Sequence, residues 1–192
     1  MLSITYISNN NGTLLVTLSV KNVDNVTNYN NYSLLFNNNE LVGINIFNID
    51  DYFQFEPGLV FASDKLLNWI KDTTKQTLSK NVNFVVAEIE ECEDIEKTHL
   101  HKCIVFDGTN KYDVVCGAKN AKKGLKVVLA KVGAIMPNGQ IISAGSLMGF
   151  ASNGMLCSLR ELKLQAESTG IIELDNSYLL GNEFLEVYKN NM

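Results

Sequence analysis

The chain has 192 residues, of which 46% are hydrophobic and 19% charged, and its 16 basic and 21 acidic side chains give a net charge of −5 at pH 7. This composition is typical of a globular protein, and the acidic balance excludes the uniformly basic surface of a dedicated nucleic-acid-binding domain. No apolar run approaches the roughly 18 residues that a transmembrane helix requires, and the N-terminus lacks the basic and apolar regions of a signal peptide. We therefore expect a cytoplasmic protein without a membrane partner.

Asparagine is abundant at the start of the chain, where the first 50 residues contain 13 of them in clusters separated by short apolar runs. Asparagine tolerates the left-handed backbone angles of tight turns, so we interpret these clusters as turns between strands. A prion-like tract is the alternative interpretation, but apolar runs of strand length recur between the clusters. The expected strands lie at residues 13–20, 32–36 and 41–47.

A helix is predicted to follow these strands. Ser63 is a suitable N-cap, and the carboxylate of Asp64 favours the positive end of a helix. The apolar residues that recur along one helix face are Leu66, Leu67, Trp69, Ile70 and Leu78. Residues 77–81 then form a boundary, so the sequence predicts a small α/β domain of unknown role at residues 1–80.

From Val82 the hydrophobic period changes to two, which is typical of half-buried strands. Val85, Ala87 and Ile89 alternate with glutamates, and turns are predicted at Asp107-Gly108 and at residues 137–139. The further expected strands lie at residues 99–106, 111–116, 125–132 and 153–157. Five or more short strands within about 80 residues indicate a small closed or nearly closed barrel.

A short helix is predicted after the last of these strands. Ser158 is followed three residues later by Glu161, which is the spacing of a capping box. The barrel and this helix together form the second expected domain, at residues 81–192.

Charge is sorted along the second half of the chain. Residues 82–115 carry three Lys against eight acids, residues 116–163 carry seven Lys and Arg against one acid, and residues 164–192 carry one Lys against five acids. The central segment thus has a local charge of opposite sign to the rest of the protein, and salt screens the distant acids from it. This pattern predicts a barrel with one face that binds a polyanion.

Four glycine-rich segments resemble a known family. They read VVCGAKNAKKGLKV at residues 114–127, AKVGAIMPNG at 130–139, LMGFASNGMLCS at 147–158, and REL at 160–162. Over residues 84–164 the chain resembles the tRNA-binding OB-fold domain found in the β subunit of bacterial phenylalanyl-tRNA synthetase and in free-standing tRNA-binding proteins, and it is most similar to the YtpR-like proteins. The resemblance implies a mainly β protein, in which an OB-fold β-barrel is preceded by a small α/β domain.

The resemblance also implies a function and a partner. We expect an RNA-binding protein that contacts the tRNA backbone by structure and not by sequence, and we expect no DNA partner. Lysine side chains can neutralise phosphates, and the family's Ser-x-Gly-Met motif is present from Ser152 to Met155. The predicted RNA-binding residues are Lys119, Asn120, Lys122, Lys123, Lys126, Lys131, Ser152, Asn153, Met155 and Arg160. Phe150 is the only aromatic residue of the basic segment, which favours backbone contact over base stacking.

Two departures from the family pattern leave an alternative open. Ser146 and Met148 stand where the family has Lys and Arg, and residues 92–100 lack its usual turn after the first strand. The alternative is a protein-interaction module or homodimer in which RNA binding is weak or lost. The net acidity of the chain also favours this alternative.

Other chemistries have weaker support in the sequence. The four cysteines lack a C-x-x-C pair, and we interpret them as free, buried thiols. His99, His101 and Cys103 alternate and would share one strand face, but no fourth ligand accompanies them, so no metal site is predicted. No nucleophile elbow, phosphate-binding loop or dinucleotide fingerprint occurs, so we expect neither an enzyme nor a cofactor.

Overall fold

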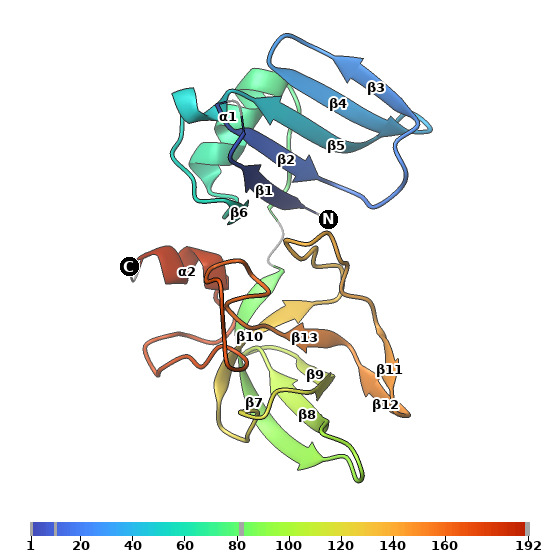
Figure 1. The fold of residues 1–192 in the computed structure, drawn as a ribbon, viewed down its shortest axis with the longest axis vertical. Helices are drawn as coiled ribbons and strands as arrows, with labels where there is room; N and C mark the ends of the chain where they lie inside the picture. Colours follow the sequence, from blue (N-terminus) through green and yellow to red (C-terminus); the bar gives the residue numbers. More distant parts are fainter. Residues whose placement is uncertain (1, 10, 81–82, 191–192) are drawn as a thin grey trace. The chain divides into compact units, whose positions relative to one another are not determined.

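The computed structural model describes residues 2–9, 11–80 and 83–190 and divides the chain into two compact units, Met1–Asn81 and Val82–Met192 (Figure 1). Strands dominate both units, as the sequence predicts. No helix among the described residues is both long enough and apolar enough to cross a membrane.

The first unit is an antiparallel sheet of six strands in the order β3-β4-β5-β2-β1-β6. Its strands are β1 (Ser3–Ile7), β2 (Thr13–Thr17), β3 (Asn25–Asn28), β4 (Tyr32–Asn37), β5 (Glu40–Phe47) and β6 (Gly58–Leu59), and a short 3-10 helix spans Ile49–Asp51. The three strands expected from the sequence correspond to β2, β4 and β5. Strands β1, β3 and β6 were not predicted. Strand β3 has no apolar alternation, because all four of its residues are exposed.

One face of this sheet packs against helix α1 (Asp64–Thr74). The Ser63 side chain accepts a hydrogen bond from the Leu66 N–H at 3.2 Å, which confirms the predicted N-cap. Leu66 and Ile70 are buried in the core of the unit. The helix ends at Thr74, because the next residue, Lys75, has a φ of 63°. Leu78, which was predicted on the helix, therefore packs against the core from outside it.

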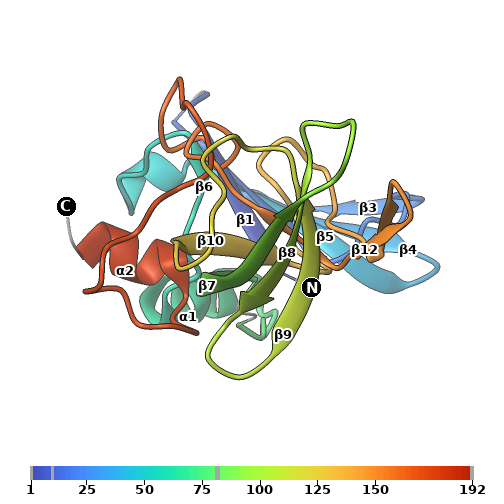
Figure 2. The same ribbon diagram turned by 90° about the horizontal axis from the view of Figure 1, so that it is seen from below.

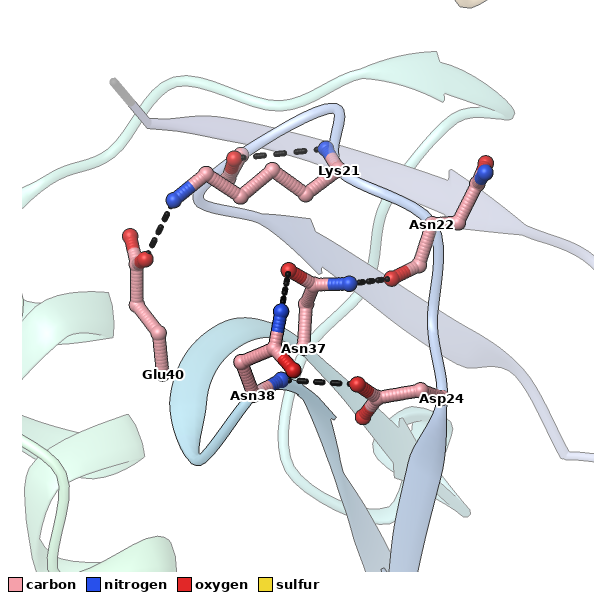
Figure 3. Close-up of polar contacts among 7 residues, drawn as sticks. Lys21, Asn22, Asp24, Asn37, Asn38 and Glu40 are labelled. Atoms are coloured by element: carbon pink, nitrogen blue, oxygen red, sulfur yellow. Dashed lines mark hydrogen bonds and ion pairs between the residues drawn. The ribbon is translucent and has the colours of Figure 1, made fainter.

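Asparagines form the β4–β5 turn (Figure 3). Asn38 and Asn39 have φ angles of 47° and 65°, the left-handed conformation that a two-residue hairpin loop requires. The Asn38 N–H donates to the Asp24 carboxylate at 2.7 Å, and Lys21 forms an ion pair with Glu40. This asparagine cluster therefore provides the turn of a hairpin in an ordered sheet.

The second unit is a five-stranded antiparallel sheet in the order β13-β10-β7-β8-β9, seen from two directions in Figures 1 and 2. Its strands are β7 (Phe84–Asp94), β8 (His101–Phe106), β9 (Lys111–Cys116), β10 (Lys126–Lys131) and β13 (Gly154–Leu156). The β9 edge approaches the β13 edge: the Asn153 N–H donates to the Asp113 carbonyl at 2.7 Å, and the Val115 N–H donates to the Ser152 hydroxyl at 3.1 Å. These bonds nearly close the sheet, and the strand order and closure confirm the predicted OB-fold.

The C-terminal segment runs beside β7 and β10. The Leu174 N–H donates to the Lys126 carbonyl at 2.9 Å, and Val86 exchanges two 2.9 Å backbone bonds with residues 181 and 182. Helix α2 (Phe184–Asn190) follows, with the Phe184 side chain fully buried. The sequence did not indicate this helix.

The helix predicted after Ser158 does not form, and residues 159–163 make a turn instead. The capping-box bonds are present, because the Ser158 N–H donates to the Glu161 carboxylate at 2.8 Å and the Glu161 N–H donates to the Ser158 hydroxyl at 3.2 Å. Lys163 then adopts a φ of 54°, and the Leu164 N–H bonds back to the Leu159 carbonyl at 2.9 Å. This closure is that of a helix C-terminus, so the helical segment ends after a single turn.

A buried carboxylate organises the β8–β9 turn. The side chain of Asp107 is only 3% exposed and accepts hydrogen bonds from four donors. The donors are the N–H groups of Thr109 (3.0 Å) and Asn110 (2.7 Å), the hydroxyl of Tyr112 (3.0 Å) and Nζ of Lys131 (2.7 Å). Burial by itself raises the pKa of this carboxyl, but the hydrogen bonds outweigh burial and lower the pKa to about 2.

Asp107→Asn is expected to lower the free energy of unfolding of the barrel unit by about 2–4 kcal/mol at pH 7, because Lys131 loses its partner in a partly buried site. Chemical denaturation measures this loss. Asp113→Asn, at an exposed carboxylate of β9, is the control and is expected to change the free energy by under about 0.5 kcal/mol. Equal effects of the two substitutions would contradict the structural role of Asp107.

The contribution of Asp107 is also expected to depend on pH. Because its pKa is lowered in the folded protein, the stabilisation of about 2 kcal/mol is present above the unfolded value near 4 and is lost as the pH falls towards 2. The difference in unfolding free energy between wild type and Asp107→Asn is therefore expected to shrink between pH 4 and pH 2. A constant difference across that range would show that the ionised carboxylate is not the source.

Candidate nucleic-acid interface

The loop between β9 and β10, at residues 117–125, presents three lysines to solvent, and we call it the lysine loop. Lys119, Lys122 and Lys123 are exposed, and their side chains make no ion pair or hydrogen bond with any residue that the structure describes. The loop itself is anchored, because Ala121 and Leu125 are buried in the barrel core and the Gly124 N–H donates to a β7 carbonyl at 2.7 Å. Because these apolar residues point into the core, the lysines between and beside them point into solvent.

A cleft of about 380 Å³ begins where this loop leaves β9. Gly117 and Ala118 line it on one side, and Met155, Arg160 and Gly170 line it from the later part of the chain. The Arg160 side chain is exposed and has no partner among the described residues. The cleft thus places a guanidinium group beside the start of the lysine loop, although the two are more than 35 residues apart in sequence.

The side chain of Asn120, another predicted RNA contact, forms hydrogen bonds within the protein. Its amide donates to the Ile171 carbonyl at 3.0 Å and to the Glu173 carboxylate at 2.9 Å, and its carbonyl oxygen accepts from the Ile171 N–H at 3.1 Å. Gly170 is required beside it, because a Cβ at that position would lie 2.2 Å from the Asn120 oxygen. Asn120 therefore fastens the C-terminal segment to the lysine loop.

Two of the predicted lysines are also engaged. Lys126 donates from Nζ to the backbone carbonyls of Tyr178 at 2.8 Å and Asn176 at 3.4 Å. Lys131 is paired with Asp107, and although burial lowers its pKa, the pairing outweighs burial and raises the pKa overall. These two cations hold the tail and the β8–β9 turn in place, so the exposed basic surface is smaller than the sequence count suggests.

Ser152 and Asn153 lie where the barrel closes. The Ser152 hydroxyl and the Asn153 N–H both bond to the β9 backbone, as described above. Gly154 is needed for the same approach, because a Cβ there would lie 2.8 Å from a Leu129 methyl group and 3.1 Å from the Ala130 carbonyl oxygen. Closure of the barrel therefore explains why Ser152, Asn153 and Gly154 are present in this motif. Met155, in contrast, lines the cleft.

Acidic side chains line a second cavity, of about 260 Å³, on the β7–β8–β9 sheet. Glu91, Glu93 and Asp113 line it together with Lys102, whose Nζ lies 2.7 Å from the Glu93 carboxylate. Phosphates are repelled by such an acidic surface. The cavity and the lysine loop therefore differ in the ligands that they favour.

A short hairpin that the sequence did not predict borders this acidic cavity. It consists of β11 (Gly145–Leu147) and β12 (Phe150–Ser152), joined by Met148 and Gly149 at φ angles of 53° and 84°. Its tip exposes apolar side chains, with Leu147 46%, Met148 61% and Phe150 38% accessible. Methionine is unusual in a left-handed turn, so the residue types did not indicate the hairpin.

The predicted alternation of two histidines with Cys103 along one strand is wrong. Strand β8 begins at His101, so His99 lies in the preceding loop, because the chain turns at residues 95–100. His101 contacts the Asp94 carboxylate through Nδ1 at 2.8 Å. Within the described parts of the chain, no three His, Cys, Asp or Glu side chains are arranged to hold a metal ion.

Comparisons with known proteins agree with the fold. The chain is 42% identical over 173 residues to the "Uncharacterized protein MG449 homolog" of Mycoplasma pneumoniae, a match that covers 84% of this chain and 74% of that protein. It is 37% identical over 165 residues to the "Putative tRNA-binding protein YtpR" of Bacillus subtilis, covering 78% of this chain and 81% of that protein.

A third relative matches about half of this chain and a small part of its own length. The phenylalanine–tRNA ligase β subunit of Paramagnetospirillum magneticum is 44% identical over 108 residues, which is 54% of this chain but 13% of the subunit. The family described as "Putative tRNA binding domain" matches residues 84–183, which contain all five barrel strands, the lysine loop and the cleft. The resemblance seen in the sequence is thereby confirmed, and the chain belongs to this tRNA-binding domain family.

Proposed function

We propose that this protein binds tRNA through the barrel unit, with the lysine loop and the adjacent cleft as the contact surface. One observation carries the proposal: Lys119, Lys122, Lys123 and Arg160 have exposed side chains without a partner among the described residues, and they lie in or beside the cleft of a family-matched barrel. Cations without internal partners can replace the counterions that surround phosphates.

The proposed contact is with the phosphate backbone and the overall shape of the RNA. No aromatic side chain lines the cleft between Gly117 and Gly170, so stacking of splayed bases has no platform there. Flexible lysines act as point charges, and they follow a phosphate backbone without reading base edges. This mode suits a folded RNA, which proteins recognise largely by its shape and backbone.

The proposed contact set is narrower than the one the sequence predicts. Lys119, Lys122, Lys123, Met155 and Arg160 form the surface. Asn120, Lys126, Lys131, Ser152 and Asn153 support it from within, because their side chains or backbone groups are bonded to other parts of the barrel. The first group should therefore govern affinity and the second should govern stability.

We further propose that residues 1–80 and 81–192 act as two domains and that the RNA contact belongs to the second. A tRNA-binding role implies a cytoplasmic location, because that is where tRNA is used. The enzyme named among the relatives corresponds to this chain over only a small part of its length, so the proposal includes no aminoacylation activity.

A protein-interaction role, including a homodimer, is the second candidate. The exposed tip of the β11–β12 hairpin favours it, because Leu147, Met148 and Phe150 form an apolar group beside acidic side chains. In that case the barrel would self-associate or dock onto a protein, and RNA affinity would be weak.

The salt dependence of tRNA binding tests the proposal. The full chain is expected to bind bulk tRNA at low salt with a dissociation constant in the micromolar range or tighter. Four phosphate contacts predict a loss of affinity of roughly 50–150-fold between 50 and 200 mM salt. Absence of binding at low salt, together with self-association in sedimentation, would instead favour the interaction module.

Charge reversal locates the site. Lys122→Glu combined with Lys123→Glu is expected to weaken tRNA binding more than tenfold, because two favourable phosphate contacts become repulsive. The matched control is Lys65→Glu with Lys97→Glu, two exposed lysines outside the basic segment, which changes the net charge equally. Thermal unfolding checks that both variants fold, and similar affinities for the two variants would reject the lysine loop as the site.

A further inference from the structure

Two cysteines face each other across the β7–β8 pair. Cys92 and Cys103 are register partners, and their sulfur atoms are 3.6 Å apart. The sequence does not indicate this pairing, because ten residues separate the two cysteines and they do not form a C-x-x-C motif. The register of the two strands brings them together.

The hydrogen-bond pattern identifies the type of pair. The Ile95 N–H donates to the Leu100 carbonyl at 2.9 Å, which makes 95 and 100 a hydrogen-bonded pair. Bonded and non-bonded pairs alternate along an antiparallel ladder, so the pair three steps further, Cys92 and Cys103, is non-hydrogen-bonded. In such a pair the Cα atoms lie about 4.5 Å apart and the side chains come closest.

This separation suits a disulfide bond. Disulfides join cysteines whose Cα atoms are roughly 4.4–6.8 Å apart, with an S–S bond of about 2.05 Å. The sulfur atoms therefore need to approach by roughly 1.5 Å, which small side-chain rotations provide without a shift of the backbone. Cys116 faces His101 in the β8–β9 register, and Val114 lies opposite Cys103 there, so Cys116 is not the register partner of Cys103.

The two thiols differ in accessibility. Cys92 is half-buried, whereas Cys103, Cys116 and Cys157 are buried. Burial raises the pKa of the Cys103 thiol, and the neighbouring Cys92 adds to the effect. Cys92 is thus the thiol that a dissolved reagent reaches first, and Cys103 is the thiol that lies in position to react with a modified Cys92.

We propose that Cys92 and Cys103 form a redox-active dithiol that closes to a cross-strand disulfide on reaction with a small-molecule disulfide. The Cys92 thiolate attacks one sulfur of the reagent, and the first reagent thiolate leaves. Cys103 then attacks the Cys92 sulfur of the mixed disulfide, and the second reagent thiolate leaves. The two cysteine protons end on the two released thiols, and the reagent gains the two electrons that the cysteine pair loses.

The bond would fasten the β7–β8 hairpin beside its turn. It closes a loop that contains the turn at residues 95–100, and it leaves the lysine loop and the cleft at Arg160 without a covalent change. The inference stands on the strand register and does not depend on tRNA binding.

Peptide mapping after oxidation tests the inference. The full-length protein is treated with oxidised glutathione, then unfolded, alkylated and digested with trypsin. A bond between Cys92 and Cys103 is expected to join the peptides 81–97 and 103–111, because Lys97 and Lys102 are cleaved between the two cysteines. Two alkyl groups, on Cys116 and Cys157, are expected in place of the four found in the reduced protein.

Two variants serve as controls. Cys157→Ser is expected to form the same cross-link at about the wild-type rate, whereas Cys103→Ser is expected to stop at a glutathione adduct on Cys92. Four alkylated cysteines after oxidation, or a cross-link that involves Cys116, Cys157 or a second molecule, would overturn the proposal. The peptide map of the oxidised wild-type protein tests the disulfide even if the Cys103→Ser variant fails to fold.

Discussion

The barrel unit depends on one strand that pairs with different neighbours along its length. Phe84 to Glu88 of β7 pair with β10, and Glu88 to Asp94 pair with β8. A bulge between Ile89 and Glu91 lies where the partner changes, and bulges bend a strand and increase its twist. Because β7 bends there, the flanking strands can turn far enough for β9 to meet the β13 edge. The core, the lysine loop and the cleft all depend on this closure.

Closure also decides which polar residues remain available for a ligand. A nearly closed barrel with a tail beside it needs hydrogen bonds at its joints, because buried backbone groups are costly when unpaired. Ser152, Asn120 and Lys126 meet that need at three separate joints. Residues that resemble a binding motif in sequence can therefore be structural, and only the cations outside the joints are left to meet a polyanion.

The barrel surface is consequently divided by charge. Acidic and apolar side chains surround the cavity between β7, β8, β9 and the β11–β12 hairpin, and unpaired cations lie at the β9–β10 loop and Arg160. The first surface repels phosphates and the second attracts them. Because the charges are sorted over the surface in this way, a net charge of −5 does not by itself argue against RNA binding.

The sequence by itself determined most of the strands with apolar alternation, although not β1. It also determined the helix after Ser63, the OB-fold and the segment that carries the cations, because periodicity, capping and irregular glycines are local signals. It did not indicate the polar strand β3 or the hairpin at Met148, which lack those signals. Only the tertiary structure decided that a capping box would end after one turn, that Lys131 belongs to Asp107, and that Cys92 meets Cys103. The ion pair and the cysteine contact depend on strand register and on partners distant in sequence, so the residues near each position do not encode them. The capping-box turn ends because Lys163 adopts a positive φ, which its residue type does not indicate.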